Sequence, residues 1–216
     1  KKYEKTISFS QFAKELKESA EKGESYTLED HYITYDSIRD KKYIKYTYSE
    51  LFSNEIKRIF VGDMQIKGLN FSEKTKVEIK NCRFGKSTQT WNTTITFQDC
   101  SFDTLLFNSN DISSISIDES KISSFQYFNV DPFLNGDKIV KELKKRENQN
   151  ENSGGVVDIT NSKITSIYCR GNTIHKQTVG DYPNNFSIYS SKVNSITIEV
   201  TSLRVSYTCI HYTTPR

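Results

Sequence analysis

A five-residue repeat of large apolar residues runs from Ile95 to Tyr127 and constrains the fold more than any other feature. Every fifth residue is large and apolar, and a second inward candidate precedes each of these by two places. The large positions are Phe97, Phe102, Phe107, Ile112, Ile117, Ile122 and Tyr127. The second positions are Ile95, Cys100, Leu105, Asn110, Ile115, Ser120 and Phe125. Seven consecutive matches predict a coil of chain that stacks on similar coils.

The five-residue period belongs to a longer repeat. The segment Ile117–Phe125 matches Ile159–Ile167 and Ile188–Ile196, while Phe97–Leu105 and Ile79–Phe84 are looser copies. The starts of these copies, taken in chain order, are 18, 20, 42 and 29 residues apart, and removing two loops brings the last two spacings close to 20. We therefore expect coils of about 20 residues with four faces, and long loops that leave from nearly the same corner of successive coils.

This pattern resembles the pentapeptide-repeat family over roughly Met64 to Leu203. The resemblance concerns the period, and it implies a right-handed, four-sided β-helix with about 20 residues per coil. The family prefers Ala, Cys or Ser at the smaller inward position, whereas this chain alternates small residues with large ones such as Leu105 and Phe125. Larger residues on alternate faces would widen or flatten the coil, so the cross-section is expected to approach that of a general parallel β-helix.

A leucine-rich repeat is the competing match, because Ile112, Ile115, Ile117 and Ile122 fit its strand segment. In that repeat the segment occurs once per 20 or more residues with a different return segment. Here the pattern recurs every ten residues, and we reject this alternative.

The period predicts one mainly β domain over residues 1–216, and residues 1–24 are its capping helix. Ser8 and Gln11 have the spacing of a capping box, and Gly23 is a helix stop. The apolar residues between them share one helical face; they are Phe9, Phe12, Ala13, Leu16 and Ala20. We expect this helix to cover the open end of the coils, with a partner-binding helix as the alternative.

The rest of the chain divides by how well it keeps the period. Residues 25–60 are rich in tyrosine and are expected to form irregular first strands, and residues 61–207 form the β-helix. Insertions are expected at about 128–156 and 175–185, the first with a short helix over Asp137–Arg146, and residues 208–216 form a tail.

Composition narrows the class of function. Hydrophobic residues make up 35%, which favours a thin, elongated core, and the net charge of +3 argues against nucleic acid as a partner. No apolar run approaches the ~18 residues of a membrane span, and no signal peptide is visible. We expect a cytoplasmic chain, with export after removal of a signal peptide as the alternative.

The cysteines and histidines indicate no metal, no cofactor and no catalytic residue. No Cys or His motif has the spacing of a zinc site or of a nucleophile with its base. Cys82, Cys100 and Cys169 fall on inward positions, where reduced thiols pack well. Stacked disulfides in a secreted protein are the alternative.

One outward position of the repeat recurs with a basic residue. It holds Arg83, Ser101, Lys121, Lys163 and Lys192, each just before an inward residue. Stacked coils would gather these into a basic stripe that favours an acidic ligand, and an ordinary solvated face is the alternative. Lys144 and Lys145 on the predicted loop helix add to this binding surface.

The sequence therefore predicts a non-catalytic binding or scaffolding protein with an acidic protein partner, and it leaves the oligomeric state open. One alternative is a carbohydrate-active β-helix enzyme that uses residues near the second loop; the candidates are Asp158, Arg170, His175 and Asp181. Another is a structural protein that assembles by stacking end to end, against which the N-terminal helix argues.

Overall fold

The computed structural model describes residues 5–36, 38–52, 55–85, 94–112, 114–128, 156–173 and 186–202. The described chain is mainly β, with one α-helix, α1 (Phe9–Lys22), and one 3₁₀ turn, η1 (Lys41–Tyr43). The strands up to the first long insertion are β1 (Lys5–Ser8), β2 (Tyr26–Glu29), β3 (His31–Thr34), β4 (Ile44–Phe52), β5 (Glu55–Lys67), β6 (Lys76–Lys80), β7 (Arg83–Phe84), β8 (Thr94–Gln98), β9 (Ser101–Asn108), β10 (Ser114–Asp118) and β11 (Lys121–Phe128). The later strands are β12 (Val156–Thr160), β13 (Lys163–Thr173), β14 (Phe186–Tyr189) and β15 (Lys192–Ser202).

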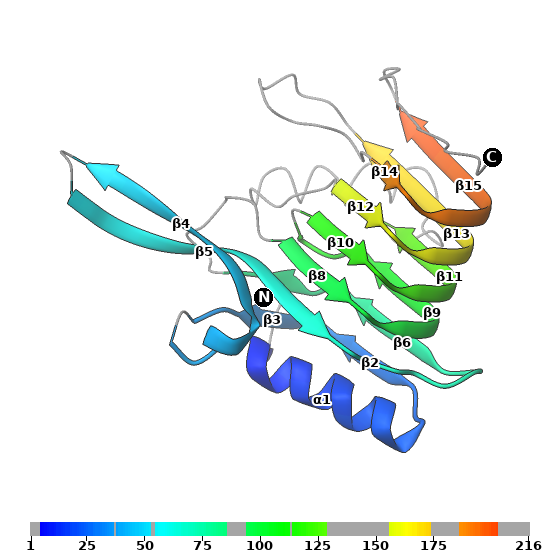
Figure 1. Cartoon of the computed structure of the whole chain (residues 1–216), viewed down its shortest axis with the longest axis horizontal. Helices are drawn as coiled ribbons and strands as arrows, with labels where there is room; N and C mark the ends of the chain where they lie inside the picture. The colour runs from blue at the N-terminus through cyan, green and yellow to red at the C-terminus, as the bar shows by residue number, and fades with distance from the viewer. Residues whose placement is uncertain are drawn as a thin grey trace.

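These strands form three sheets. The first six-stranded sheet has the order β14-β12-β10-β8-β5-β4, the second has the order β15-β13-β11-β9-β6-β2, and a three-stranded sheet has the order β1-β3-β7. All pairs are parallel except β4 with β5, which form an antiparallel hairpin. Figure 1 shows the two large sheets as rows of strands that run from α1 at one end to β14 and β15 at the other.

The strand register confirms the alignment of the three strongest repeat copies. Ile117 lies opposite Ile159, which in turn lies opposite Ile188, in the first six-stranded sheet. In the second sheet Phe125 lies opposite Ile167, and Ile167 opposite Ile196. The insertions between these copies therefore leave the register of the strands unchanged.

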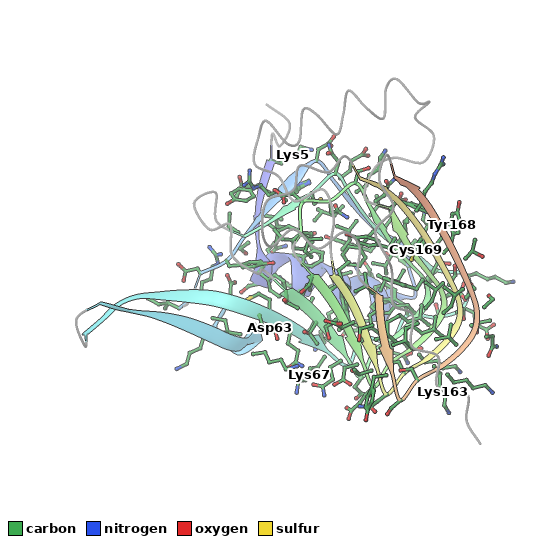
Figure 2. All side chains as sticks on the ribbon, turned by 90° about the horizontal axis from the view of Figure 1, so that it is seen from above. Lys5, Asp63, Lys67, Lys163, Tyr168 and Cys169 are labelled. Carbon is green, nitrogen blue, oxygen red and sulfur yellow. The ribbon has the colours of Figure 1, made fainter. Side chains whose placement is uncertain are left out.

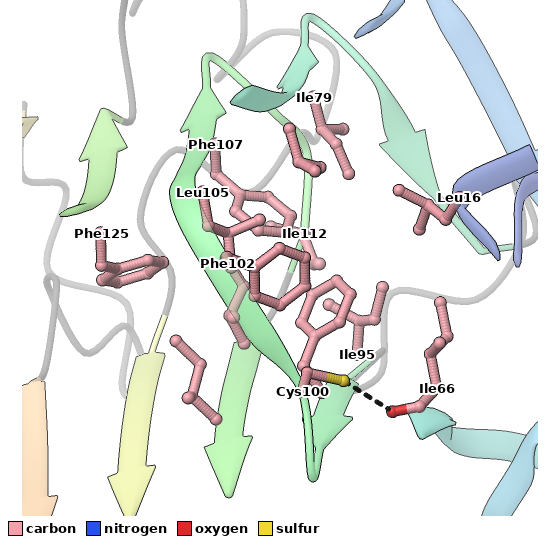
Figure 3. Packing of buried hydrophobic residues seen from close by; sticks show 14 of the residues in the cluster. Leu16, Ile66, Ile79, Ile95, Cys100, Phe102, Leu105, Phe107, Ile112 and Phe125 are labelled. Atoms are coloured by element: carbon pink, nitrogen blue, oxygen red, sulfur yellow. Dashed lines mark hydrogen bonds between the residues drawn. The ribbon is translucent and has the colours of Figure 1, made fainter. Parts of the chain in front are cut away.

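The inward positions of the repeat form one hydrophobic core (Figure 3). Every large position from Phe97 to Tyr127 is at most 4% exposed, as predicted. The rings of Phe71 and Phe102 stack with their centroids 5.5 Å apart, and Phe97 meets Phe102 edge-on at 5.4 Å. Full burial of one such side chain is worth about 1.5–3 kcal/mol, so the ladders of large residues are the main source of stability.

A left-handed residue turns the chain from the first six-stranded sheet into the second. The residues at this corner are Gly68, Asp99, Glu119, Asn161 and Ser190, with φ between 48° and 69°. The backbone N–H of Asp99 donates to Asp118 O at 3.1 Å, and that of Glu119 donates to Thr160 O at 3.1 Å. A left-handed conformation costs a non-glycine residue roughly 1–2 kcal/mol, which these inter-strand hydrogen bonds offset.

The small inward residue after this corner belongs to a ladder of hydrogen bonds. Ser120 Oγ donates to Asp118 O at 2.7 Å and accepts from the backbone N–H of Cys100 at 3.0 Å. Ser162 repeats both bonds one strand later: it donates to Thr160 O and accepts from the N–H of Ser120. The small position therefore satisfies buried backbone groups at a tight corner, and this is why it is polar inside an apolar core.

Helix α1 closes one end of the core, as the sequence predicts. Ser8 Oγ accepts from the N–H of Gln11 at 3.0 Å, and Gly23 ends the helix with φ 68°. Phe9, Phe12 and Leu16 are fully buried against the first strands. The described contacts of Gln11 do not include the reciprocal bond of the capping box, and its side-chain Nε2 donates to Glu15 Oε1 at 2.9 Å.

The early strands are more regular than predicted. Leu28 lies opposite Ile79 and Ile33 opposite Phe84, so the period already holds in part of residues 25–60. The irregularity comes from the β4–β5 hairpin, which separates β3 from the next parallel strands and projects from the sheets in Figure 1.

The sequence alignment matched Ile79 with Phe97, and this prediction of the strand register is wrong. Ile79 lies opposite Phe107, and it is Ile66 that lies opposite Phe97. The segment Asn81–Phe84 resembles Asp99–Phe102 in sequence, but Arg83 and Phe84 pair with β3 in the three-stranded sheet, whereas Ser101 and Phe102 pair with β11 in the second six-stranded sheet. The predicted helix Asp137–Arg146 and the predicted tail 208–216 lie outside the described residues.

Candidate functional site

Three lysines stand in register on the outer face of the second six-stranded sheet. Lys121 lies opposite both Ser101 and Lys163, and Lys163 lies opposite Lys192. Neighbouring strands are about 4.8 Å apart, so the three side chains leave the sheet at about that spacing. All three are exposed, and Figure 2 shows Lys163 at the rim of the molecule. We call Lys121, Lys163 and Lys192 the lysine column.

The backbone around each lysine fixes its outward direction. The residue before each lysine is a serine of the hydrogen-bond ladder described above, which we call the serine ladder. The residue after each lysine points inward: Ile122 and Ile164 are buried, and Val193 is half-buried. The lysine N–H groups bond to the preceding strand, with Lys121 N donating to Cys100 O and Lys163 N to Ser120 O, both at 2.9 Å. Because strand residues alternate between faces, a side chain between two inward ones points to solvent.

The lysine column keeps its charge unneutralised by the described residues. Of the ion pairs that form within the described ranges, none involves Lys121, Lys163 or Lys192. Asp118 accepts from Thr160 Oγ1 at 2.8 Å, and Glu119 accepts from Gln98 Nε2 at 3.2 Å. The next two strands have Asn161 and Ser190 at that corner, so the column becomes more positive toward β15.

Arg83 does not lie in the column. It is on β7 in the three-stranded sheet, and its Nε lies 3.2 Å from Asp111 Oδ2 in a largely buried ion pair. The position opposite Ser101 belongs to Asn70 instead. The prediction that grouped Arg83 with the lysines is therefore wrong in its placement, and Lys144 and Lys145 lie outside the described residues.

The structure describes two of the residues considered for carbohydrate chemistry, Asp158 and Arg170, and it places them in different sheets. Asp158 lies opposite Ser116 and Ser187 in the first six-stranded sheet, whereas Arg170 lies in the second sheet. Burial raises the pKa of Asp158 above its ordinary value. His175 and Asp181 lie outside the described residues, so the enzyme alternative remains a prediction.

The inward cysteines are part of the core, as expected. Cys82, Cys100 and Cys169 are free and buried. Burial raises the pKa of Cys82 to about 12 and that of Cys100 to about 11, so both thiols stay protonated near neutral pH. Within the described ranges no group of three or more His, Cys, Asp or Glu side chains is placed to hold a metal ion.

Sequence reasoning missed the exposed Tyr189, which comes three residues before Lys192 and is 66% exposed. The repeat carries the signal, because Tyr189 occupies the position held by Asp118 and Thr160 in earlier strands, and that position faces outward. Polar residues at equivalent places predict an exposed side chain there, whatever its type.

Comparisons with protein-family models, with curated proteins and with solved structures found no match for this chain. In the described part of the chain, no helix has the length and apolar character needed to cross a membrane.

Proposed function

We propose that the chain is a right-handed parallel β-helix, similar in its period to pentapeptide-repeat proteins, and that it acts as a non-catalytic binding scaffold. The regular parallel register supports the coil, since each unit contributes one strand to each large sheet. In the unit from Ile95 to Ile112, all eight inward positions are at most 5% exposed, as a four-faced coil requires. Right-handed connections are the rule between parallel strands of one sheet.

The observation that carries the binding proposal is the lysine column. Two unit charges about 4.8 Å apart repel by about 1 kcal/mol in water, and this is the upper limit for neighbouring lysines whose side chains leave the sheet at that spacing. The three lysines have no carboxylate partner in the described ranges. An acidic partner relieves this repulsion and adds attraction, so the column favours such a partner over a neutral one.

The insertions define a second candidate binding edge, at the opposite ends of the first-sheet strands from the column. Residues 85–93 connect β7 to β8, residues 129–155 connect β11 to β12, and residues 174–185 connect β13 to β14. Each insertion therefore precedes a strand of the first six-stranded sheet. Long insertions on repeat scaffolds gather on a binding face, so we propose that the edge where these strands begin is a second binding surface, to which the insertion that carries Lys144 and Lys145 contributes.

The experiment compares partners captured by the wild-type chain and by two triple variants. One replaces the lysine column (Lys121→Gln, Lys163→Gln, Lys192→Gln), and its matched control replaces three exposed lysines near the helical cap (Lys14→Gln, Lys17→Gln, Lys41→Gln). We expect the column variant to lose the captured protein while the control, with the same change in net charge, retains it. Equal capture by all three chains, once circular dichroism shows that all are folded, would remove the column from the function.

A further inference from the structure

The spacing of the lysine column restricts what can bind all three lysines at once. The column covers two strand-to-strand steps, about 9.6 Å in all. An α-helix that lies along the column places residues i, i+4 and i+7 on one face, over about 10.5 Å. An extended strand in the same orientation places i, i+2 and i+4 on one face, over about 13 Å. The helix therefore differs from the column by about 1 Å and the strand by about 4 Å.

Among the described residues, the surface beside the column leaves room for a helix. The next outward positions after the lysines are Ser123, Thr165 and Asn194, all exposed and all shorter than lysine. Ser166 and Ser195, which follow, donate to backbone carbonyls of neighbouring strands at 3.2 Å and 3.4 Å and so lie close to the sheet. A cylinder about 10 Å wide can approach such a low surface, and the long lysine side chains reach its flank.

The charges at the two ends of the column differ. Asp99 and Glu119 are exposed at the corner beside Ser101 and Lys121, whereas Asn161 and Ser190 take their place beside Lys163 and Lys192. A ligand with negative charge is therefore repelled if it extends past Lys121 toward β9, and it meets no described carboxylate at this corner toward β15. The negative C-terminal end of a helix favours the side of Lys192, and the positive N-terminal end favours the side of Glu119.

We propose that the partner's binding element is an α-helix with acidic residues at i, i+4 and i+7, and that it lies along the lysine column with its C-terminal end toward β15. This inference rests on the proposed function and names the class of its partner. Lys163 forms the central contact, between Lys121 and Lys192. The contacts are exposed ion pairs, so binding weakens as the salt concentration rises.

Two synthetic peptides of identical composition test this proposal with the full chain. Both are held helical by a side-chain bridge; one has glutamates at i, i+4 and i+7, and the other distributes the same glutamates around the helix. We expect the one-face peptide to bind about tenfold tighter, and the column variant to lose about that factor, since three exposed ion pairs together are worth roughly threefold to a hundredfold. The Lys14, Lys17 and Lys41 control should bind like the wild type.

A sulfated oligosaccharide serves as the third probe, because a flexible polyanion needs no helical spacing. Equal affinity for the two peptides would overturn the helix, and so would preferential binding of the oligosaccharide. A loss of binding in the control variant as large as in the column variant would also contradict the assigned site. If capture of the native partner depends on the column while the two peptides bind alike, the binding scaffold stands and only the helical partner fails.

Discussion

The hydroxyl of Ser120 donates to Asp118 O at a buried corner, and it is also the acceptor for the backbone N–H of Cys100. Replacement by alanine leaves that N–H without its acceptor, which costs about 1–3 kcal/mol. We expect Ser120→Ala to lower the free energy of unfolding by this amount, as measured by urea denaturation.

Cysteine is the matched control at this position, because Cys100 occupies the equivalent place one strand earlier and its Sγ donates to Gln98 O at 3.2 Å. Ser120→Cys should therefore cost clearly less than Ser120→Ala. An equal loss for both variants would mean that the ladder of hydrogen bonds does not contribute to stability.

The carboxylate of Asp40 makes the folding stability of the chain depend on pH. Its carboxylate is fully buried and accepts from the N–H groups of Ser10 and Asp36 and from the guanidinium of Arg39. Burial alone raises the pKa of Asp40, but the hydrogen bonds from Arg39 and Ser10 and from the backbone outweigh it and hold the pKa below its ordinary value. A lowered folded-state pKa contributes stability above the unfolded value of about 3.9.

That contribution disappears as the pH falls through the folded-state pKa of Asp40. We expect the melting temperature of the wild type to drop below about pH 4, and Asp40→Asn to be less stable at pH 7 and to lose less on acidification. Thermal melts from pH 3 to pH 7 measure both effects. Parallel curves for the two chains would show that other carboxylates cause the acid sensitivity.

At the scale of elements, α1 is predicted to be the main cover of the core at its end. Leu16 is fully buried beneath the helix, whereas the neighbouring Lys17 is exposed. Leu16→Ala should cost about 2–5 kcal/mol of unfolding free energy, and Lys17→Ala should stay within about 0.5 kcal/mol. Denaturant titration of the two variants checks this, and a small loss for Leu16→Ala would mean that the helix does not seal the core.

The sequence predicted these elements unequally, for physical reasons. Helix α1 has a cap, an apolar face and a glycine stop within one short segment, so local information is sufficient. The position of Arg83 depends on which sheet holds its segment, and a five-residue period looks the same in every sheet. Only the pairing of distant strands separates Arg83 from Lys121, and no local pattern reports it.

Across the whole molecule, the strand register was likewise only partly predictable from the sequence. The alignment of Ile117, Ile159 and Ile188 was predictable because the copies are nearly identical in pattern. The pairing of β2 with β6 was not predictable, since their paired residues lie 51 positions apart in the chain (Tyr26 with Val77) and an antiparallel hairpin comes between them. The lysine column was predictable for Lys121, Lys163 and Lys192, because a residue of the serine ladder precedes each of them.

Cross-linking of the column tests the central claim, that these lysines stand in register on adjacent strands. Three double cysteine variants are made in a Cys209→Ser background: Lys121→Cys with Lys163→Cys, Lys163→Cys with Lys192→Cys, and Lys121→Cys with Lys192→Cys. Adjacent-strand partners lie about 4.8 Å apart, within reach of a disulfide, whereas the third pair is about 9.6 Å apart and beyond the ~7 Å limit. Mass spectrometry of dilute, oxidised protein should find an intramolecular disulfide in the first two variants and none in the third. A disulfide between positions 121 and 192, or none between 121 and 163, would contradict the register on which the binding face depends.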